Sequence, residues 1–139
     1  MAIQLKNMKG TEFVKKILKG ERDFSGIKLE RGFNLSEYDG FAEMNDYLKN
    51  QDLSQNPVQI NDSDFSYVKA NGIYLPLTQG VRADLYGANL SRANLSRVMN
   101  LEKAIYLEYA DFLNTIVTEK EKKIIEKARE SIKLFDVRS

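Results

Sequence analysis

The chain has 139 residues, 42% apolar and 29% charged, enough for one domain with a core and too few for two ordinary ones. Lys and Arg number 21 against 20 Asp and Glu, and the net charge of +1 excludes an overall field that attracts DNA or imitates it. Cys and His are absent, which excludes disulfides, thiolate or imidazole metal sites, and catalytic triads that use His.

The composition also bears on location and ligands. No apolar run approaches the roughly 18 residues of a membrane span, and no segment resembles a signal peptide. No glycine-rich phosphate loop of the Gly-x-x-x-x-Gly-Lys type is present. We therefore expect a cytoplasmic, non-catalytic protein with no membrane partner, no direct nucleic-acid binding, no metal site and no cofactor.

Residues 1–20 predict a small N-terminal cap. Residues 2–6 alternate apolar and polar side chains, which predicts a short strand. Thr11 is the expected N-cap of a helix that continues to residue 19 and stops at Gly20. The apolar face of this helix consists of Phe13, Val14, Ile17 and Leu18.

Residues 30–62 lack a fixed frame. Short triplets with a charged middle residue and an apolar last residue end at Phe24, Leu29 and Met44, and the spacing between them is irregular. Two interpretations of residues 36–62 stay open: a loop inserted between regular segments, or a degenerate continuation of the same pattern. An inserted loop often carries a binding site.

Residues 83–97 contain three consecutive five-residue units: Ala-Asp-Leu-Tyr-Gly and then Ala-Asn-Leu-Ser-Arg twice. A period of five fits neither an isolated helix nor a long strand. The two apolar positions of a unit lie on one face of a very short strand, and the remaining polar or small residues suit a turn. Such units bury their apolar side chains only by winding into a coil and stacking on copies of themselves.

Four units per turn place residues 20 apart above one another. The expected columns are Phe65, Leu85 and Ile105; Leu75 and Leu95; and Ala70 and Leu90. An insertion of one residue adds Phe24 and Met44 to the first column. The small residues Ala83, Ala88 and Ala93 also point inward in this arrangement, because a narrow coil has no space for a second large side chain.

Residues 118–139 predict a C-terminal capping helix. Thr118 is the expected N-cap and Glu121 the partner residue of a capping box. Two roles are open for the apolar stripe of this helix: a lid over the last coil, or a homodimer contact with heptad-like spacing. The stripe consists of Ile124, Ile125, Ala128, Ile132 and Phe135.

The repeat resembles the pentapeptide-repeat family, whose consensus is Ala-(Asp/Asn)-Leu-x-x. The resemblance is strongest over residues 83–97 and covers roughly residues 21–117. It implies a mainly β protein, a right-handed quadrilateral β-helix of about five coils, roughly 24 Å long at ~4.8 Å per coil. The expected inward centres of the repeat are Phe24, Leu29, Met44, Phe65, Leu75, Leu85, Leu90, Leu95, Leu107 and Phe112.

Two functions are consistent with this resemblance. The first is a rigid scaffold that binds a protein of unknown identity through a coil face or residues 36–62, with a homodimer through the C-terminal helix or a coil end as a further alternative. The second is inhibition of DNA gyrase by mimicry of duplex DNA, as for some members of the family. Residues 22–117 have a net charge of −4, which is far below the charge density of DNA, about one charge per 1.7 Å.

Overall fold

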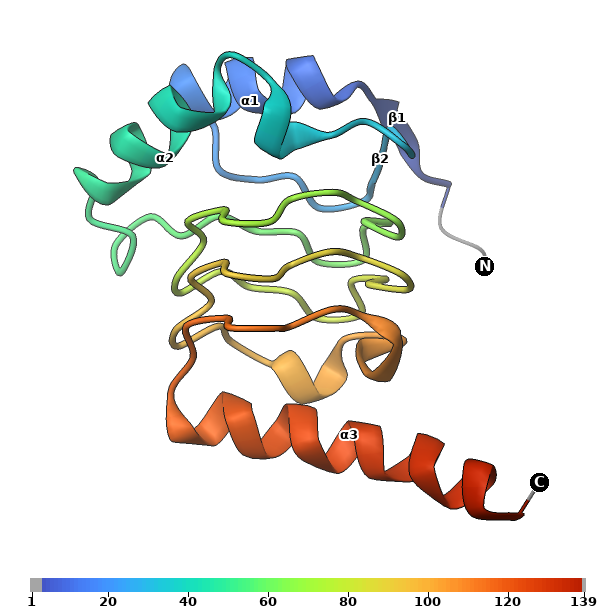
Figure 1. Ribbon diagram of the computed structural model, residues 1–139. Helices are drawn as coiled ribbons and strands as arrows, with labels where there is room; N and C mark the ends of the chain where they lie inside the picture. The colour runs from blue at the N-terminus through green and yellow to red at the C-terminus, as the bar shows by residue number, and fades with distance from the viewer. Residues whose placement is uncertain (1–3, 139) are drawn as a thin grey trace.

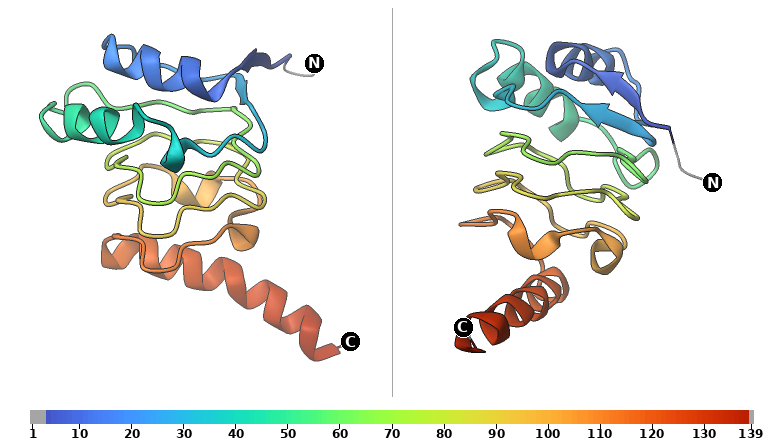
Figure 2. Two further views of the ribbon diagram at one scale, coloured as in Figure 1. Left: turned by 45° about the horizontal axis from the view of Figure 1, so that its top comes forward. Right: turned by 90° about the vertical axis from the view of Figure 1, so that its right-hand side faces the viewer.

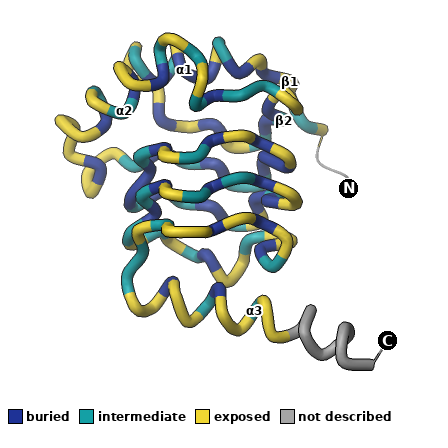
Figure 3. The backbone as a smooth tube through the Cα atoms, viewed as in Figure 1, coloured by how far each residue is buried: buried dark blue, intermediate teal, exposed yellow. Residues whose placement is uncertain are grey.

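The computed structural model describes residues 4–138, with side chains described for residues 4–130, in three layers (Figure 1). Helices α1 (Gly10–Leu18) and α2 (Phe41–Lys49) cover one end of a stack of coils. Helix α3 (Glu119–Arg138) crosses the other end. Buried residues recur in every coil and in the helices that cover the ends, so the core runs along the stack between the helical layers (Figure 3).

Residues 20 apart in the sequence pair side by side through the regular part of the stack, which two further views show from other directions (Figure 2). The Leu75 N–H, for example, donates to the Asn94 carbonyl at 2.9 Å. One full turn of the chain therefore has four sides, each joined to the next turn by a parallel bridge. These bridges are Gln59–Gln79, Asp64–Asp84, Lys69–Asn89 and Tyr74–Asn94.

Each five-residue unit turns a corner two residues after its central apolar side chain. Arg92, two residues after Leu90, has a φ of 60°, and Gly87 has a φ of 66°. The Ala93 N–H donates to the Leu90 carbonyl at 3.1 Å. A positive φ at the third residue together with this hydrogen bond is the arrangement of a type II turn. The polar or small end of the repeat therefore forms the corners.

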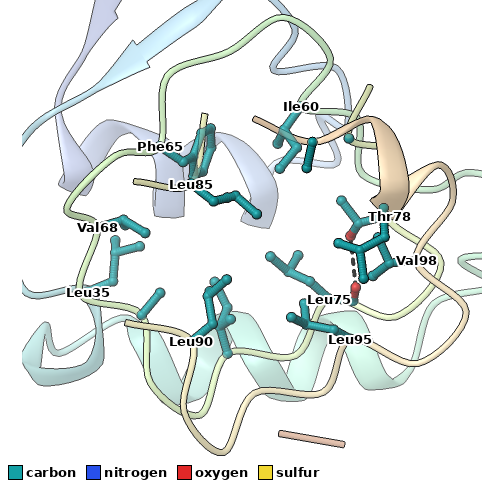
Figure 4. Close-up of a pocket in the computed structure, with 15 residues that line it drawn as sticks. Leu35, Ile60, Phe65, Val68, Leu75, Thr78, Leu85, Leu90, Leu95 and Val98 are labelled. Atoms are coloured by element: carbon teal, nitrogen blue, oxygen red, sulfur yellow. Dashed lines mark hydrogen bonds between the residues drawn. The ribbon is translucent and has the colours of Figure 1, made fainter. Parts of the chain in front are cut away.

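The interior consists of side chains that converge from all four sides (Figure 4). All ten residues expected to point inward are buried, none more than 7% exposed, and Ala83, Ala88 and Ala93 are buried beside them. Full burial of one such leucine contributes about 1.5–3 kcal/mol. An apolar cavity of about 50 Å³ remains between these side chains. Because its walls are the core itself, we interpret it as a packing void.

The first expected column is wrong in its upper members. The Phe24 N–H donates to the Gln59 carbonyl, which places Phe24 over Ile60 on a different side of the stack. Leu29 takes the place above Phe65. The predicted alignment of Phe24 with Phe65 failed because the residues between them do not all belong to the coil: helix α2 lies outside it.

Strand β1 (Lys6–Met8) pairs in parallel with strand β2 (Ile27–Leu29) and adds a layer above one side of the stack. The strand expected over residues 2–6 therefore begins only at Lys6, and residues 2 and 3 lie outside the described residues.

Helix α1 begins at Gly10 with Lys9 at the N-cap position, so the expected Thr11 cap is wrong and Thr11 lies in the first turn. Glu30 from the adjacent coil supplies the cap instead, because its Oε1 accepts from the Gly10 N–H at 3.1 Å. A carboxylate at a helix N-terminus is favourable. The Phe13 ring of α1 closes the interior, with its centroid 4.7 Å from Phe24 and 5.7 Å from Phe65.

Neither interpretation of residues 36–62 is correct as stated. The segment does leave the coil, but it contains helix α2 rather than only a loop, and its last residues, from Gln59, belong to the coil again. A 3₁₀ turn (Leu35–Glu37) leads out of the coil into α2, and the chain returns to the stack at Gln59. Met44 is fully buried, as expected, but it belongs to α2 and not to a coil. The helix contributes Phe41, Met44 and Leu48 to the core because these residues recur at helical spacing.

Asn45 of α2 takes the place of a missing coil above one side of the stack. Its Oδ1 accepts from the Tyr74 N–H at 3.0 Å, and its Nδ2 donates to the Gly72 carbonyl at 3.2 Å. One side chain thus satisfies a backbone donor and a backbone acceptor that a further coil would otherwise pair.

The last coil, residues 98–117, contains two extra residues. Its pairing offset rises from 20 to 21 at Asp84–Ile105 and to 22 at Asn89–Asp111. The extra residues form 3₁₀ turns at Leu101–Lys103 and Leu107–Tyr109. Ile105 is 40% exposed, so its expected place in the first column is wrong, and the buried Leu107 fills the interior instead.

Helix α3 begins directly after Thr118, the expected N-cap residue. The Glu121 carboxylate accepts from the Thr118 N–H at 3.0 Å, but the Thr118 hydroxyl donates to that carboxylate and does not cap a backbone N–H. Ile125 is buried at the end of the stack, which supports the lid interpretation for the first turns. The side chains of Ile132 and Phe135 lie outside the described set, so the homodimer alternative stays a prediction.

Only β1 and β2 are long enough to be assigned as strands within residues 4–138, and single bridges join the other segments. The right-handed quadrilateral β-helix class and the domain boundaries at residues 20 and 117 stay predictions. The stacked pairing and the buried columns are the observations that favour them.

Candidate functional site

Four tyrosines form a row at one corner of the stack, which we call the tyrosine ladder: Tyr67, Tyr86, Tyr106 and Tyr109. Their exposed fractions are 45%, 38%, 48% and 50%. They make up half of the large apolar or aromatic residues that are exposed among those described. The remaining tyrosines, Tyr38, Tyr47 and Tyr74, pack against the core.

The ladder rings contact one another from coil to coil. The Tyr86 centroid lies 5.5 Å from Tyr67, 5.5 Å from Tyr106 and 5.2 Å from Tyr109. Interplanar angles of 66°, 88° and 43° give edge-to-face and tilted pairs, which are favourable arrangements for aromatic rings. The mutual contacts hold the rings in place although each is substantially exposed to solvent.

Gly87 makes room for the upper part of the ladder. A Cβ atom at this position would lie 2.7 Å from Cδ1 of the Tyr67 ring, which is too close for a real contact. The φ of 66° at Gly87 also favours glycine. The absence of a side chain at Gly87 therefore leaves space for the Tyr67 ring, which contacts Tyr86.

Arg31 closes the upper end of the ladder. Its guanidinium carbon lies 5.4 Å from the Tyr67 ring centroid, within the range of a cation–π interaction. Its Nη2 is 3.6 Å from Oδ2 of Asp64. The arginine thus has an aromatic face and a carboxylate as partners.

The Asp and Asn residues that precede the repeat centres serve the turns. Asp84 Oδ1 accepts from the Tyr86 N–H at 3.0 Å, and Asn89 Oδ1 accepts from the Ser91 N–H at 3.1 Å. These local hydrogen bonds give the Asp and Asn side chains a structural role in the turns. Among the described residues, no group of three Asp, Glu, His or Cys side chains could hold a metal ion.

Local interactions lower the pKa of two carboxyls on the coils, those of Asp23 and Asp62. Hydrogen bonds from the Ser25 backbone and side chain lower the pKa of Asp23. A hydrogen bond from Arg82, together with its charge, lowers the pKa of the exposed Asp62 carboxyl, and Asp62 raises the pKa of Arg82. Neither arrangement is that of a carboxyl kept protonated for acid catalysis.

Two clefts on the described part of the chain combine charges of both signs. A cleft between β1, β2 and α1 is lined by Lys9, Glu12, Lys28, Glu30 and Arg31, so its charges are mixed. Glu30 is already engaged at the start of α1. A cleft beside α3 combines Glu102, Glu108 and Lys127 with apolar residues.

Comparison with known families identifies the repeat. Residues 59–97 match the family model for pentapeptide repeats in eight copies. These residues are pentapeptide repeats. Searches among curated proteins and solved structures returned no match. In the described part of the chain, no helix is long and apolar enough to cross a membrane.

The sequence analysis did not predict the tyrosine ladder. The signal was present, because Tyr86 and Tyr106 are 20 residues apart and Tyr67 lies 19 residues before Tyr86. A search for outward residues at the coil period would have found the row. Residues 36–62, the other expected contact segment, instead devote the apolar face of α2 to the core.

Proposed function

We propose that this pentapeptide-repeat protein is a non-catalytic scaffold that binds a protein partner through the tyrosine ladder. The observation that carries the proposal is the exposed, mutually packed row of four tyrosines. Tyrosine is enriched at protein interfaces, where its ring contributes a large contact area at low entropic cost. Packing between the rings fixes them before binding and so reduces that cost further.

The surrounding surface favours the ladder over other faces. Elsewhere in residues 59–97 the outward positions are mostly polar, and their side chains form turn hydrogen bonds, as at Asn94 and Ser96. The apolar face of α2, with Phe41, Met44 and Leu48, is buried in the core and is therefore not free to contact a partner.

The test is site-specific cross-linking followed by reconstitution. A photoreactive phenylalanine at Tyr86 in the full-length chain identifies the partner in cells, with the same group at Met99 as the control. The purified partner is then titrated by calorimetry against a double variant, Tyr86→Ser with Tyr106→Ser. The control double variant, Met99→Ser with Ile116→Ser, removes side chains that are 47% and 57% exposed on other sides of the same coil.

We expect the ladder variant to lose at least 10-fold in affinity, because central aromatic residues dominate protein interfaces. The control variant should bind within threefold of wild type. Equal losses from both variants, or no loss from the ladder variant, would contradict the proposal.

Inhibition of gyrase by DNA mimicry stays the alternative that the sequence leaves open. A supercoiling assay with the purified protein tests it, and no inhibition at micromolar concentration would exclude it. The homodimer alternative is tested by the mass of the protein in solution.

A further inference from the structure

The ladder repeats one combination of groups in two successive coils. At the upper position, Arg31 lies 5.4 Å from the Tyr67 ring centroid and 3.6 Å from Asp64. Asp84 pairs with Asp64 across the coils and brings a second carboxylate to the next level. The Tyr86 ring belongs to the same level, and its backbone N–H is bound by Asp84.

The lower combination has no cation of its own. Among the residues whose side chains are described, Asp84 forms no ion pair, and no Arg or Lys lies over Tyr86, Tyr106 or Tyr109. The two levels differ in detail, because Tyr67 occupies the corner position that Gly87 occupies one coil below. Both levels nevertheless place an aromatic ring beside an outward carboxylate.

Further acidic groups lie in the last coil, next to the coil that contains Asp84 and Tyr86. Glu108 belongs to the 3₁₀ turn that carries Tyr109, and Asp111 follows it by three residues. Neither forms an ion pair with a described side chain. Two bases of α3 lie nearby. Lys127 lines the cleft that also contains Glu108, without forming an ion pair with it, and the Arg129 guanidinium contacts the Ala110 carbonyl and the Phe112 ring rather than the ladder.

We propose, resting on the proposed function of the ladder, that its lower part binds an arginine side chain of the protein partner. Arginine fits this surface better than lysine because its planar guanidinium stacks on a ring while its N–H groups reach a carboxylate. Arg31 already makes both contacts at the upper level. The net charge of −4 over residues 22–117 favours a cationic segment in the same way.

The probe is the blocked peptide acetyl-(Gly-Arg)4-amide, with acetyl-(Gly-citrulline)4-amide as its neutral counterpart of nearly the same shape. Full-length protein labelled with carbon-13 in its tyrosine rings is titrated with each peptide, and the ring signals are followed by NMR. We expect the arginine peptide to shift the signals of Tyr86, Tyr106 and Tyr109, with a citrulline affinity at least 10-fold lower. Added salt should weaken the arginine complex.

Matched variants locate the charge that is recognised. Asp84→Asn keeps an acceptor for the Tyr86 N–H and removes only the carboxylate charge, and it should reduce affinity at least threefold. The control is Asp23→Asn, because Asp23 accepts from the Ser25 N–H in the same manner on another side of the stack. That variant should bind the peptide as wild type does.

The outcomes separate this inference from the proposed function. Equal affinity for both peptides, or arginine-dependent shifts confined to other tyrosines, would overturn the arginine site while leaving the ladder as a partner surface. Loss of the ladder's role in partner binding, measured by the calorimetric titration above, would overturn the proposed function itself.

Discussion

Residues 59–97 and residues 98–117 follow the same backbone pairing but present different surfaces. Three bridges place a polar outward residue of the regular coils directly beside an apolar one of the last coil: Gln79–Met99, Asp84–Ile105 and Asn94–Ile116. The backbone hydrogen bonds between coils are formed in both regions, so they do not explain why the outward side chains change from polar to apolar. Outward positions are free to vary in polarity, because their side chains do not enter the core and single exposed apolar residues are common on protein surfaces.

The two extra residues of the last coil also distinguish residues 98–117 from the regular coils. Regular coils turn with one positive-φ residue per unit, whereas the last coil absorbs two additional residues in 3₁₀ turns. One of these turns carries Tyr109 of the ladder. The departure from the repeat is therefore also the place where the ladder widens from one ring to two.

The largest expected effect comes from replacing an inward and an outward leucine by aspartate, one in each region. Leu90→Asp buries an unpaired charge in the regular stack and should cost several kcal/mol, enough to unfold the body. Leu113→Asp, at a side chain that is 66% exposed in the last coil, should change the free energy of unfolding by less than about 0.5 kcal/mol. Thermal unfolding followed by circular dichroism measures both, and equal melting temperatures would show that the inward columns are misassigned.

A second test concerns the first regular coil, which has α2 above one side in place of another coil. Asn45→Ala removes both hydrogen bonds of the side chain and exposes the Tyr74 N–H and Gly72 carbonyl, and it should cost about 2 kcal/mol. Asn50→Ala is the control, because that side chain bonds only to Asp46 within its own helix and is exposed. Denaturant unfolding measures the difference, and equal losses would argue against the role of Asn45.

A third test uses pH at the junction of the regular coils with α3. Burial raises the pKa of Glu121, but hydrogen bonds from Thr118 and the Arg97 backbone outweigh burial and leave the pKa below its ordinary value of 4.5. A lowered folded-state pKa stabilises the protein above the unfolded-state pKa, and that stabilisation is lost as the pH falls through the folded-state value. Glu121→Gln should therefore cost about 1 kcal/mol at pH 7.

The Glu121→Gln deficit should shrink as the pH falls below 4.5, where the wild-type carboxyl becomes protonated. Urea unfolding of both proteins at pH 7 and at successively lower pH measures the deficit. A deficit that is the same at pH 7 and pH 3 would contradict the ionised role of Glu121.

The smallest expected effect sharpens the comparison at the ladder itself. Gly87→Ala and Gly72→Ala both place alanine at a positive φ and should each cost about 1 kcal/mol. Only the Gly87 substitution meets a ring, that of Tyr67, whereas nothing lies within 4 Å of the Cβ position at Gly72. Near-ultraviolet circular dichroism reports the ring packing, because the chain contains no tryptophan. Equal spectra would show that Gly87 does not support the ladder.

The regular repeat was readable from the sequence because each unit fixes its own geometry. In residues 83–97 the alanine, the Asp or Asn, and the leucine each have one structural task, and all three tasks recur every five residues. Met44 shows why the prediction failed outside this region. Its burial was expected correctly, but an apolar residue between polar ones fits a helix as well as a coil, and only the spacing to Phe41 and Leu48 distinguishes them.

The candidate site could not be predicted in the same way, because its tyrosines come together only through the stacking of the coils. Tyr109 reaches the ladder only because of the extra residues before it, and no local pattern announces the gap that Gly87 leaves for Tyr67. Glu30 as a remote cap for α1 is a similar case, since 20 residues separate it from Gly10. Contacts of this kind depend on the path of the chain and not on adjacent letters.

At each end of the stack a side chain binds backbone groups of the outermost coil, which has a consequence for assembly. Asn45 covers Gly72 and Tyr74 at one end, and Glu121 binds the Arg97 N–H at 2.7 Å at the other. Stacked coils otherwise end in open backbone groups that invite further strands. The Asn45 amide and the Glu121 carboxylate form hydrogen bonds that the backbone of a further coil would otherwise form. Because they are side chains, they leave no unpaired strand edge for another chain to bind. The stack is thereby limited in length, and removal of both side chains would favour end-to-end polymers.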